Sequence, residues 1–328
     1  MPQPVLTVTG LNVVFELHRS QVNAVSDLSF TLNAGQTLAV VGESGSGKSQ
    51  AFLSIMGLLA KNGRATGSAM LGDVNLVGMP PDKLDTYRGR DIAMIFQDPM
   101  TSLNPTLKVR TQLAEVLVKH RGFSQDEALK TVVGMLERVG IPEPAKRANA
   151  YPHELSGGMR QRVMIAMALL CQPKILIADE PTTALDVTVQ AQMLDLFKDL
   201  TNDFGTALVL ITHDLGVVAG VADEVMVMYG GRCMEQGPVD SLFYDPRHPY
   251  TLGLLHSTPH VGRRAARLEP IEGLPPNLER LPPGCVFHPR CAFRFDRCFS
   301  ERPPLLEVDE TRSKACWYGG RLAYEDVA

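Results

Sequence analysis

The residues best suited to chemistry form one short stretch, Gly42-Glu43-Ser44-Gly45-Ser46-Gly47-Lys48-Ser49, which matches the pattern G-x-x-x-x-G-K-[ST]. Glycines let backbone N–H groups converge on phosphate oxygens without a Cβ in the way. The Lys48 amine would reach the β- and γ-phosphates of a nucleotide, and the Ser49 hydroxyl would bind Mg²⁺. The stretch therefore predicts a nucleotide-phosphate site, and a chance glycine-rich turn is the alternative.

The residues on either side supply the elements that this motif requires. Thr37 to Val41 is apolar and β-branched enough for a buried strand, and the apolar residues from Phe52 to Leu59 recur with a helical period. A turn from a strand into a helix places the helix N-terminus, with its partial positive charge and unpaired N–H donors, at the phosphates. This context favours the phosphate site over the chance turn.

Two further buried strands end in polar residues. Lys174 to Glu180 ends in two carboxylates, and such a strand beside a phosphate loop usually provides the second Mg²⁺ ligand. Asp179 would hold the ion, and Glu180 would orient or deprotonate a water that attacks the γ-phosphate. Ala207 to Ile211 leads into His213. Because ligands of open parallel sheets bind at the carboxyl ends of the strands, we interpret His213 as functional rather than structural.

A helical segment separates these strands in the sequence. Ile92 to Phe96 is a short apolar strand that ends in Gln97, and a loop of prolines and small polar residues follows it. Helical periodicity then runs from Val109 to Val139, and no strand is evident until residue 174. The pattern indicates an inserted helical lobe.

Two features allow more than one interpretation. Ser156 is suited to be a helix N-cap, and Gly157 and Gly158 would expose N–H donors there, so this helix start either receives an anion or is a plain capped helix. Phe15 lies in a region of alternating residues, Val5 to Phe30, that predicts antiparallel strands. Its ring either joins the core or offers a flat face to a purine.

Composition excludes several other classes of protein. The chain has 328 residues, 45% of them hydrophobic, and a formal net charge of −4, which argues against nucleic-acid binding by bulk electrostatics. No apolar run approaches the roughly 18–20 residues of a membrane span. The N-terminus lacks the basic patch and apolar core of a signal peptide. We therefore expect a cytoplasmic protein that docks on a partner.

Taken together, residues 5 to 258 resemble the nucleotide-binding subunit of ABC transporters. The resemblance rests on the phosphate loop, Gln97, Leu155-Ser156-Gly157-Gly158, Ile175 to Glu180, Ala184-Leu185-Asp186 and His213. Met159 departs from the pattern, since many members have Gln there, and we expect little effect because it follows the anion-binding donors.

The resemblance implies roles that spacing cannot supply. Two such subunits face each other head to tail, so that the helix start of one caps the γ-phosphate held by the loop of the other. Gln97 would sense Mg²⁺ and the attacking water, and His213 would contact the γ-phosphate. Phe15 would stack on adenine. The implied ATP-binding residues are Phe15, Gly42, Glu43, Ser44, Gly45, Ser46, Gly47, Lys48, Ser49, Gln50 and Asp179. The implied catalytic residues are Glu180, His213, Gln97 and Lys48. The residues toward the partner's ATP are Ser156, Gly157, Gly158 and Asp186, and the Mg²⁺ ligands are Ser49, Gln97 and Asp179.

Within this family the chain resembles the peptide and nickel importer branch. The matching phrases are Phe96 to Pro105, Tyr151 to Glu154 and Arg247 to Tyr250, and Met56 to Gly63 is closer still to oligopeptide permeases. The resemblance implies an ATPase that powers peptide uptake from the cytoplasmic face of the cell membrane. Its partners would be a second ATPase subunit in a heterodimer, two membrane permeases and, indirectly, an extracytoplasmic peptide-binding protein. A nickel importer ATPase and a soluble ABC ATPase are the alternatives.

Four cysteines lie near the C-terminus: Cys285, Cys291, Cys298 and Cys316. A cytoplasmic chain disfavours structural disulfides, so the thiolates could instead hold zinc or an iron–sulfur cluster. The absence of C-x-x-C pairs argues against zinc. The tail resembles the extension of peptide-importer ATPases, some of which carry a [4Fe–4S] cluster, and that cluster is our prediction. Free thiols are the remaining alternative.

These observations predict an α/β fold of the P-loop NTPase (ABC ATPase) kind. It would combine a nucleotide-binding core, an antiparallel β subdomain, an inserted α-helical subdomain at about 98–165 and a small Cys-rich C-terminal extension. We expect an ATPase domain over residues 1–258 and the extension over 259–328, where prolines such as Pro275-Pro276 and Pro282-Pro283 reduce regular structure.

Overall fold

The computed structural model describes residues 4–97, 102–181, 187–257 and 270–322. The chain divides into two compact units. The first contains Met1–Val5, Asn33–Gly35 and Pro80–Val209, and the second contains Leu6–Leu32, Gln36–Met79 and Leu210–Ala328. Within the described ranges, no helix combines the length and the apolar character that a membrane crossing requires.

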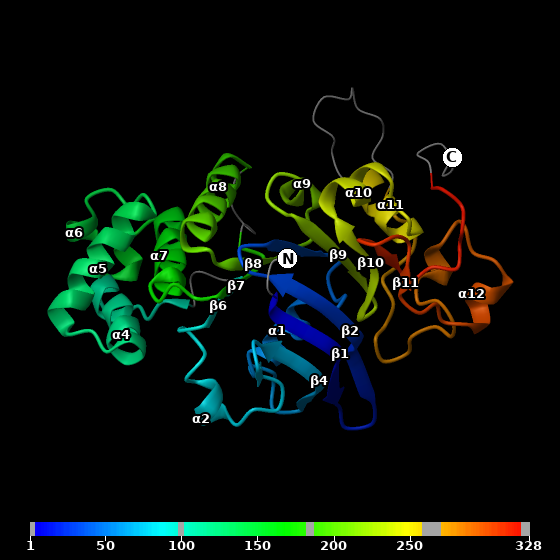
Figure 1. Cartoon of the computed structure of the whole chain (residues 1–328), viewed down its shortest axis with the longest axis horizontal. Coiled ribbons are helices and arrows are strands. Elements are labelled where there is room, and N and C mark those ends of the chain that lie inside the picture. Colours follow the sequence, from blue (N-terminus) through cyan, green and yellow to red (C-terminus); the bar gives the residue numbers. More distant parts are fainter. Residues whose placement is uncertain (1–3, 98–101, 182–186, 258–269, 323–328) are drawn as a thin grey trace. The chain divides into compact units, whose positions relative to one another are not determined.

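The first unit holds the helical lobe that the sequence predicts. Its elements are α2 (Pro81–Leu84), β6 (Ile92–Ile95), α4 (Val109–Arg121), α5 (Gln125–Arg138), α6 (Pro144–Arg147), η1 (Pro152–Glu154), α7 (Gly157–Leu169), β7 (Ile175–Asp179) and α8 (Val187–Phe204). The helices α4, α5 and α7 pack against one another, as Figure 1 shows. Helix α8 is the longest of these, at 18 residues. No described residue between 102 and 174 lies in a strand, so the prediction of an inserted helical segment is confirmed.

Local signals explain how two of these helices begin and end. Helix α4 stops at Gly122, whose φ of 67° places it in the left-handed region that glycine adopts without cost. Helix α5 begins with a capping box, because the Ser124 side chain accepts a hydrogen bond from the N–H of Glu127 while the Glu127 side chain accepts one from the N–H of Ser124. The buried faces, which include Leu113 and Leu136, then form the core of the lobe.

Strands β6 and β7 run parallel and in register in the first unit. Ile92 pairs with Ile175, and Ile95 pairs with Ala178. All five residues of β7 are buried, which fits the continuous apolar pattern of a strand covered on both faces. Because the two strands end together, the residues that follow them, Gln97 and Glu180, lie at the same edge.

The second unit contains an antiparallel sheet, a parallel strand pair and the C-terminal segment 270–322, which we call the tail. Its elements are β1 (Pro4–Glu16), β2 (Gln21–Asn33), β3 (Thr37–Val41), α1 (Lys48–Ile55), β4 (Gly63–Leu71), β5 (Val74–Asn75), α9 (Leu215–Val218), β9 (Glu224–Tyr229), β10 (Arg232–Pro238), α10 (Val239–Tyr244), α11 (Pro249–His256), η2 (His288–Arg290), α12 (Asp296–Ser300), β11 (Leu306–Glu307) and β12 (Ser313–Lys314). Strand β8 (Ala207–Thr212) begins in the first unit and ends in the second.

The antiparallel sheet has the strand order β2-β1-β4-β5, as the alternating pattern of the N-terminal region predicts. In the other sheet, β3 pairs in parallel with β9, β9 pairs antiparallel with β10, and β10 pairs with β12 of the tail. The sequence gives no sign of this last pairing, since it predicts little regular structure in the tail.

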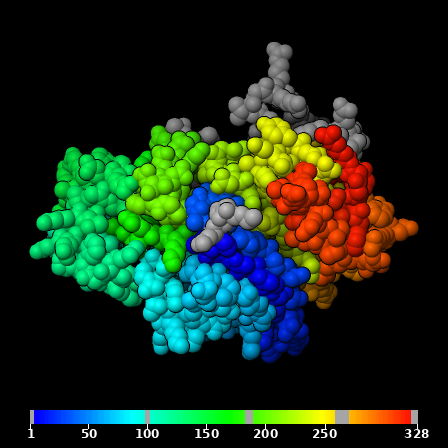
Figure 2. All heavy atoms as spheres, in the orientation of Figure 1, coloured from blue at the N-terminus to red at the C-terminus, as the bar shows by residue number. Residues whose placement is uncertain are grey.

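The core of the second unit includes side chains from the tail. Val41 of β3, Tyr229 of β9 and Tyr250 of α11 are buried in the same cluster as Val286 and Phe287. Figure 2 shows the orange and red atoms of the tail directly beside the yellow atoms of α10 and α11. The tail therefore folds against these elements rather than around a core of its own.

Candidate functional site

The glycine-rich stretch adopts the strand–turn–helix arrangement that its sequence predicts. Strand β3 is fully buried, the turn follows it directly, and α1 begins at Lys48. The N-cap of α1 is Gly47, with a φ of 97° and no side-chain cap. The first N–H groups of the helix have no intrahelical partner, so they can bind an anion.

Two glycines of the turn have no room for a side chain. At Gly42, where φ is 150°, an added Cβ would collide with the backbone oxygen of Met228. At Gly47, it would collide with the backbone oxygen of Ala24. Glycine is required at both positions, because the turn packs closely against the neighbouring backbone.

The Lys48 side chain is buried within this loop. Its amine donates to the backbone oxygen of Gly42 at 2.6 Å and to that of Glu43 at 3.0 Å, and it lies 3.4 Å from the Ser46 hydroxyl. The loop is also bonded to the turn between β9 and β10, since the Gly231 N–H donates to the Ser46 backbone oxygen at 3.0 Å. A cation thus lies within the turn that precedes the N-terminus of α1, which is an arrangement suited to phosphate.

Glu43 makes contacts in the second unit that sequence reasoning missed. Its N–H donates to the Tyr250 hydroxyl at 2.9 Å. Its carboxylate receives two hydrogen bonds from the Arg290 guanidinium, at 2.6 and 3.0 Å. The only sequence signal was indirect: Tyr250 belongs to the Arg247 to Tyr250 phrase, and Arg290 precedes one of the four tail cysteines.

In the first unit, the ends of β6 and β7 bring two predicted residues together. The Gln97 amide donates to the Glu180 carboxylate over 3.0 Å. Asp179, the last residue of β7, is buried. Glu180 has a φ of 47°, which non-glycine residues seldom adopt, and such strain is found preferentially at functional sites.

The predicted helix start at Ser156 is present in the first unit. The Ser156 hydroxyl accepts a hydrogen bond from the Met159 N–H at 3.3 Å, so it is the N-cap of α7. Ser156 and Gly157 are exposed. Because α7 is 13 residues long and its first turn faces solvent at these residues, its N–H donors are available to an anion.

The remaining predicted residues lie as follows. His213 is exposed directly after β8 in the second unit. The half-buried Phe15 ring lies against Gly63, where an added Cβ would be 2.7 Å from its Cε1 atom. Ser49 and Gln50 are in the first turn of α1. Asp186 lies outside the described residues, as do the first residues of the loop after Gln97.

The four tail cysteines line one pocket in the second unit, together with aromatic residues such as Phe287 and Trp317. Burial raises the pKa of Cys291 to about 12 and that of Cys316 to about 11, so without a bound cation these thiols are protonated. Among the described residues, no group of three or more His, Cys, Asp or Glu side chains is placed to hold a metal ion. The predicted [4Fe–4S] cluster therefore has donors of the right kind and number, but their positions here do not support it.

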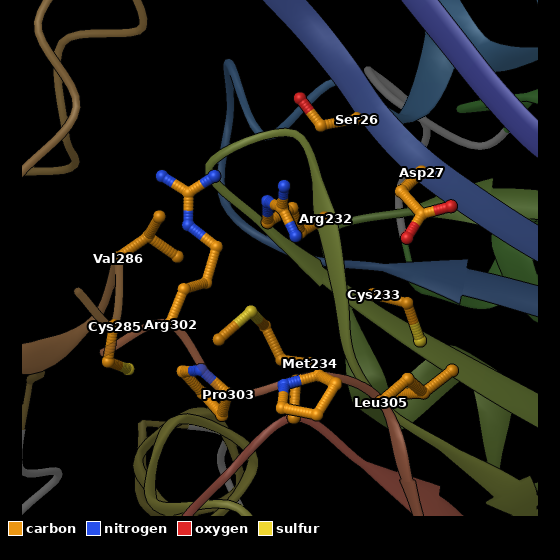
Figure 3. A pocket seen from close by; sticks show the side chains of 12 residues that line it. Ser26, Asp27, Arg232, Cys233, Met234, Cys285, Val286, Arg302, Pro303 and Leu305 are labelled. Carbon is orange, nitrogen blue, oxygen red and sulfur yellow. The ribbon is translucent and has the colours of Figure 1, made fainter. Parts of the chain in front are cut away.

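A second pocket in this unit is also lined by Cys285. Its walls include Ser26, Asp27, Arg232 and Arg302. In Figure 3 both guanidinium groups face this pocket. Burial, together with the charge of Arg302, lowers the pKa of Arg232. None of the predicted nucleotide-site residues lines it.

Comparison with protein-family models gives two matches. Residues 25–183 match the family described as "ABC transporter", and residues 234–298 match "Oligopeptide/dipeptide transporter, C-terminal region". The first covers the phosphate loop and the β7 carboxylates. The second begins in β10 and continues through the third tail cysteine.

Curated proteins and solved structures agree with these matches. The chain is 54% identical to the oligopeptide transport ATP-binding protein OppD of Salmonella typhimurium, over 96% of this chain and 95% of that protein. It is 50% identical to the dipeptide transport ATP-binding protein DppD of Bacillus subtilis, over 99% and 98% of the two chains. The structure is similar to the dimeric, post-hydrolysis state of the ATP-binding cassette MJ0796 bound to ADP and Pi, with a TM-score of 0.64 and 27% identity, over 71% of this chain and 98% of that chain.

Proposed function

Because the chain belongs to the family of oligopeptide and dipeptide transport ATP-binding proteins of ABC transporters, we propose that it is the ATP-hydrolysing subunit of a peptide importer. One observation carries the proposal: relatives named for peptide transport match over nearly their whole length, including the C-terminal region. A shared ATPase core alone would leave the cargo open.

The phosphate loop binds ATP in this proposal. Lys48 and the N–H groups at the start of α1 receive the β- and γ-phosphates, and Phe15 stacks on the adenine. The oxygen donors of Ser49, Gln97 and Asp179 fit Mg²⁺, which prefers hard oxygen ligands. Bound Mg²⁺ would neutralise developing charge on the phosphates.

Glu180 is the base in this proposal. The Gln97 amide donates to one of its carboxylate oxygens, which restricts the rotation of the group that would deprotonate a water. His213 contacts the γ-phosphate of the bound ATP. Support for these roles comes from the strained Glu180 backbone and from the common edge at which β6 and β7 end.

A second ATPase subunit completes the site. Ser156, Gly157 and Gly158 then face the γ-phosphate held by the partner's loop, and Asp186 lies beside that contact. The exposed start of α7 supports this arrangement, since it is an anion-binding helix terminus with no phosphate of its own. The similar ATP-binding cassette is dimeric with ADP and Pi.

We further propose that the chain is peripheral, at the cytoplasmic face of the cell membrane, where it docks on two permease subunits. An extracytoplasmic binding protein would deliver the peptide, and nucleic acid plays no part. The proposed domains are an ATPase domain over 1–258, with the helical subdomain at about 98–165, and the Cys-rich extension over 259–328. A nickel importer is the alternative of the same branch.

For the tail, we propose that Cys285, Cys291, Cys298 and Cys316 bind a [4Fe–4S] cluster. The proposal rests on the kind and number of donors, four thiols in a cytoplasmic protein, because their described positions do not form a metal-binding group. A bound cluster would act as a staple for a segment with little apolar core. Protein purified without oxygen should be brown and contain about four irons per chain. A colourless preparation with stoichiometric zinc, or with free thiols only, would reject the cluster.

Reconstitution tests the main proposal. The chain, its cognate permeases and the second ATPase are placed in vesicles, with the binding protein on the opposite side, and labelled peptide or Ni²⁺ is supplied. We expect MgATP to drive peptide accumulation, and the Lys48→Ala variant to abolish it. Uptake of Ni²⁺ instead of peptide would support the alternative. Peptide accumulation that is indifferent to MgATP would reject the importer.

A further inference from the structure

One acidic residue of the phosphate loop is held from three directions. Glu43 donates its N–H to Tyr250, its backbone oxygen accepts from Lys48 at 3.0 Å, and its carboxylate is paired with Arg290. A carboxylate within a phosphate loop weakens phosphate binding unless its charge is neutralised, because a negative charge nearby disfavours binding of another anion. The cation that pairs with this carboxylate should therefore affect how tightly the loop binds a nucleotide.

The guanidinium of Arg290 pairs with the carboxylate as a fork. Its Nη1 donates to Oε2 of Glu43 at 2.6 Å and its Nη2 donates to Oε1 at 3.0 Å. The side chain of Arg290 is only 5% exposed, whereas that of Glu43 is 25% exposed. Bidentate Arg–carboxylate pairs are strong and fixed in direction, and lysine cannot reproduce them.

Other contacts fix the guanidinium in this position. It donates to the backbone oxygens of Ile271 and Glu272, at 3.1 and 2.9 Å, and to the Tyr229 hydroxyl at 3.3 Å. The donors of Arg290 are thus used by groups from the tail, from β9 and from the phosphate loop. Such a network holds the arginine in place independently of any nucleotide.

The backbone around Arg290 is anchored by the core of the second unit. The Phe287 ring contacts Tyr229 and Tyr250, with ring centroids 5.2 Å apart in both pairs. The Cys285 N–H donates to the backbone oxygen of Cys298 at 2.9 Å. Arg290 also directly precedes Cys291 of the cysteine pocket. The position of the arginine is therefore set by the fold of the tail.

We propose that Arg290 is a positioning residue for the nucleotide site: it neutralises Glu43 and holds this part of the phosphate loop in the form that receives ATP. The inference rests on the proposed function, since it assumes that the loop binds ATP. It makes the C-terminal tail part of the ATP-binding machinery, and it assigns the tail an electrostatic role at the loop. The tail acts through Glu43, so it should affect ATP affinity more than the chemical step.

The test is a double-mutant cycle in the full chain, with Arg290→Gln, Glu43→Gln and the double variant. MgATP affinity is measured for the isolated subunit, and KM and kcat are measured in the assembled transporter. Removing one partner of a buried charge pair costs tenfold or more, so we expect Arg290→Gln to raise the Kd and KM by about tenfold, with a smaller change in kcat. The Glu43→Gln change should restore most of this affinity in the double variant, because the unpaired carboxylate is gone.

Arg294→Gln is the matched control, because Arg294 is an exposed arginine of the same segment that donates to the Cys291 backbone oxygen rather than to Glu43. It should bind ATP like the unmodified chain. Melting temperatures report whether each variant folds. If Arg290→Gln does not fold, Arg290→Lys takes its place in the cycle: lysine keeps the charge but cannot form the bidentate pair, so we expect a smaller loss of affinity, which Glu43→Gln should again restore in the double variant.

Two results would overturn the inference: unchanged KM in the arginine variant, or a double variant as weak as the arginine variant alone. The second would mean that the arginine acts only through packing. Absence of ATP binding by the unmodified chain is a different result, since it would reject the proposed function itself. The two failures are therefore distinguishable.

Discussion

The Gln97 amide and the Glu180 carboxylate are 3.0 Å apart, although 83 residues separate them in the sequence. The parallel register of β6 and β7 explains the contact. Ile95 pairs with Ala178, so the residues just beyond the two strands emerge at the same edge. An amide that donates to one carboxylate oxygen restricts the rotation of the whole group, which is what a positioned base requires.

Replacing this carboxylate should separate binding from turnover. Glu180→Gln retains the size of the side chain but cannot accept a proton, so we expect ATP binding to persist and turnover to fall by about 10²–10⁴. Single-turnover hydrolysis and equilibrium ATP binding measure the two effects. Asp195→Asn, at an exposed position of α8, is the matched acidic control and should leave both unchanged. Near-normal hydrolysis by Glu180→Gln would remove this residue from its role.

Loss of the loop lysine should act on binding itself. Lys48 is the buried cation of the loop, and its amine holds two backbone oxygens. Lys48→Ala removes the cation that would reach the β- and γ-phosphates, so we expect a large loss of ATP affinity. Binding of a fluorescent ATP analogue measures it, with the exposed Lys61→Ala as control. An affinity equal to that of the unmodified chain would contradict the phosphate-loop assignment.

The loop glycines should differ in their tolerance of alanine. Gly42 and Gly45 both have positive φ, at 150° and 78°, but only the Gly42 Cβ would collide with a backbone atom, whereas the Gly45 Cβ meets nothing within 4 Å. Backbone strain of this kind costs about 1–3 kcal/mol, and a collision with backbone adds to it. We expect Gly42→Ala to lower the melting temperature and ATP affinity more than Gly45→Ala. Equal effects would mean that the close approach to Met228 does not matter.

Much of the site could be predicted because its signals are local. The phosphate loop needs a strand, a glycine turn and a helix within about twenty residues, and Thr37 to Leu59 carries all three in order. The ends of buried strands predicted Asp179, Glu180 and His213 as candidates, since strand ends are where such sheets bind ligands, and the family resemblance added Gln97. Ser156 followed from N-cap chemistry alone.

The contacts of the tail could not be predicted in this way. Glu43 and Arg290 are 247 residues apart, and no periodicity relates them. Similarly, β12 pairs with β10 through backbone hydrogen bonds that depend on the path of the chain rather than on side-chain pattern. The cysteine count indicated four donors, but only coordinates could give their positions, and these do not form a metal-binding group among the described residues.

Buried groups beside the tail should make stability depend on pH. Burial raises the pKa of Glu235 to about 7. The hydrogen bonds that its carboxylate accepts from the N–H groups of Arg247 and His248, at 2.6 and 2.9 Å, offset part of this rise. A raised carboxyl pKa means that the folded state holds the proton more tightly than the unfolded state. The contribution to stability is then full below the ordinary pKa of 4.5 and is lost as the pH rises toward about 7.

His248 affects stability in the opposite direction. Burial lowers its pKa to about 3, so its contribution to stability is lost as the pH falls below its ordinary value of 6.5.

The Glu235→Gln variant tests the contribution of the Glu235 carboxyl group to the pH dependence of stability. It should destabilise the protein at every pH, by about 1–3 kcal/mol, because its amide cannot accept both N–H groups. The destabilisation should also be larger near pH 5 than near pH 7.5. The difference between the two pH values is roughly 1.4 kcal/mol for each tenfold difference in proton affinity between the folded and unfolded states. Thermal unfolding of both proteins at the two pH values measures this, and a constant difference in melting temperature would show that Glu235 does not titrate in this range.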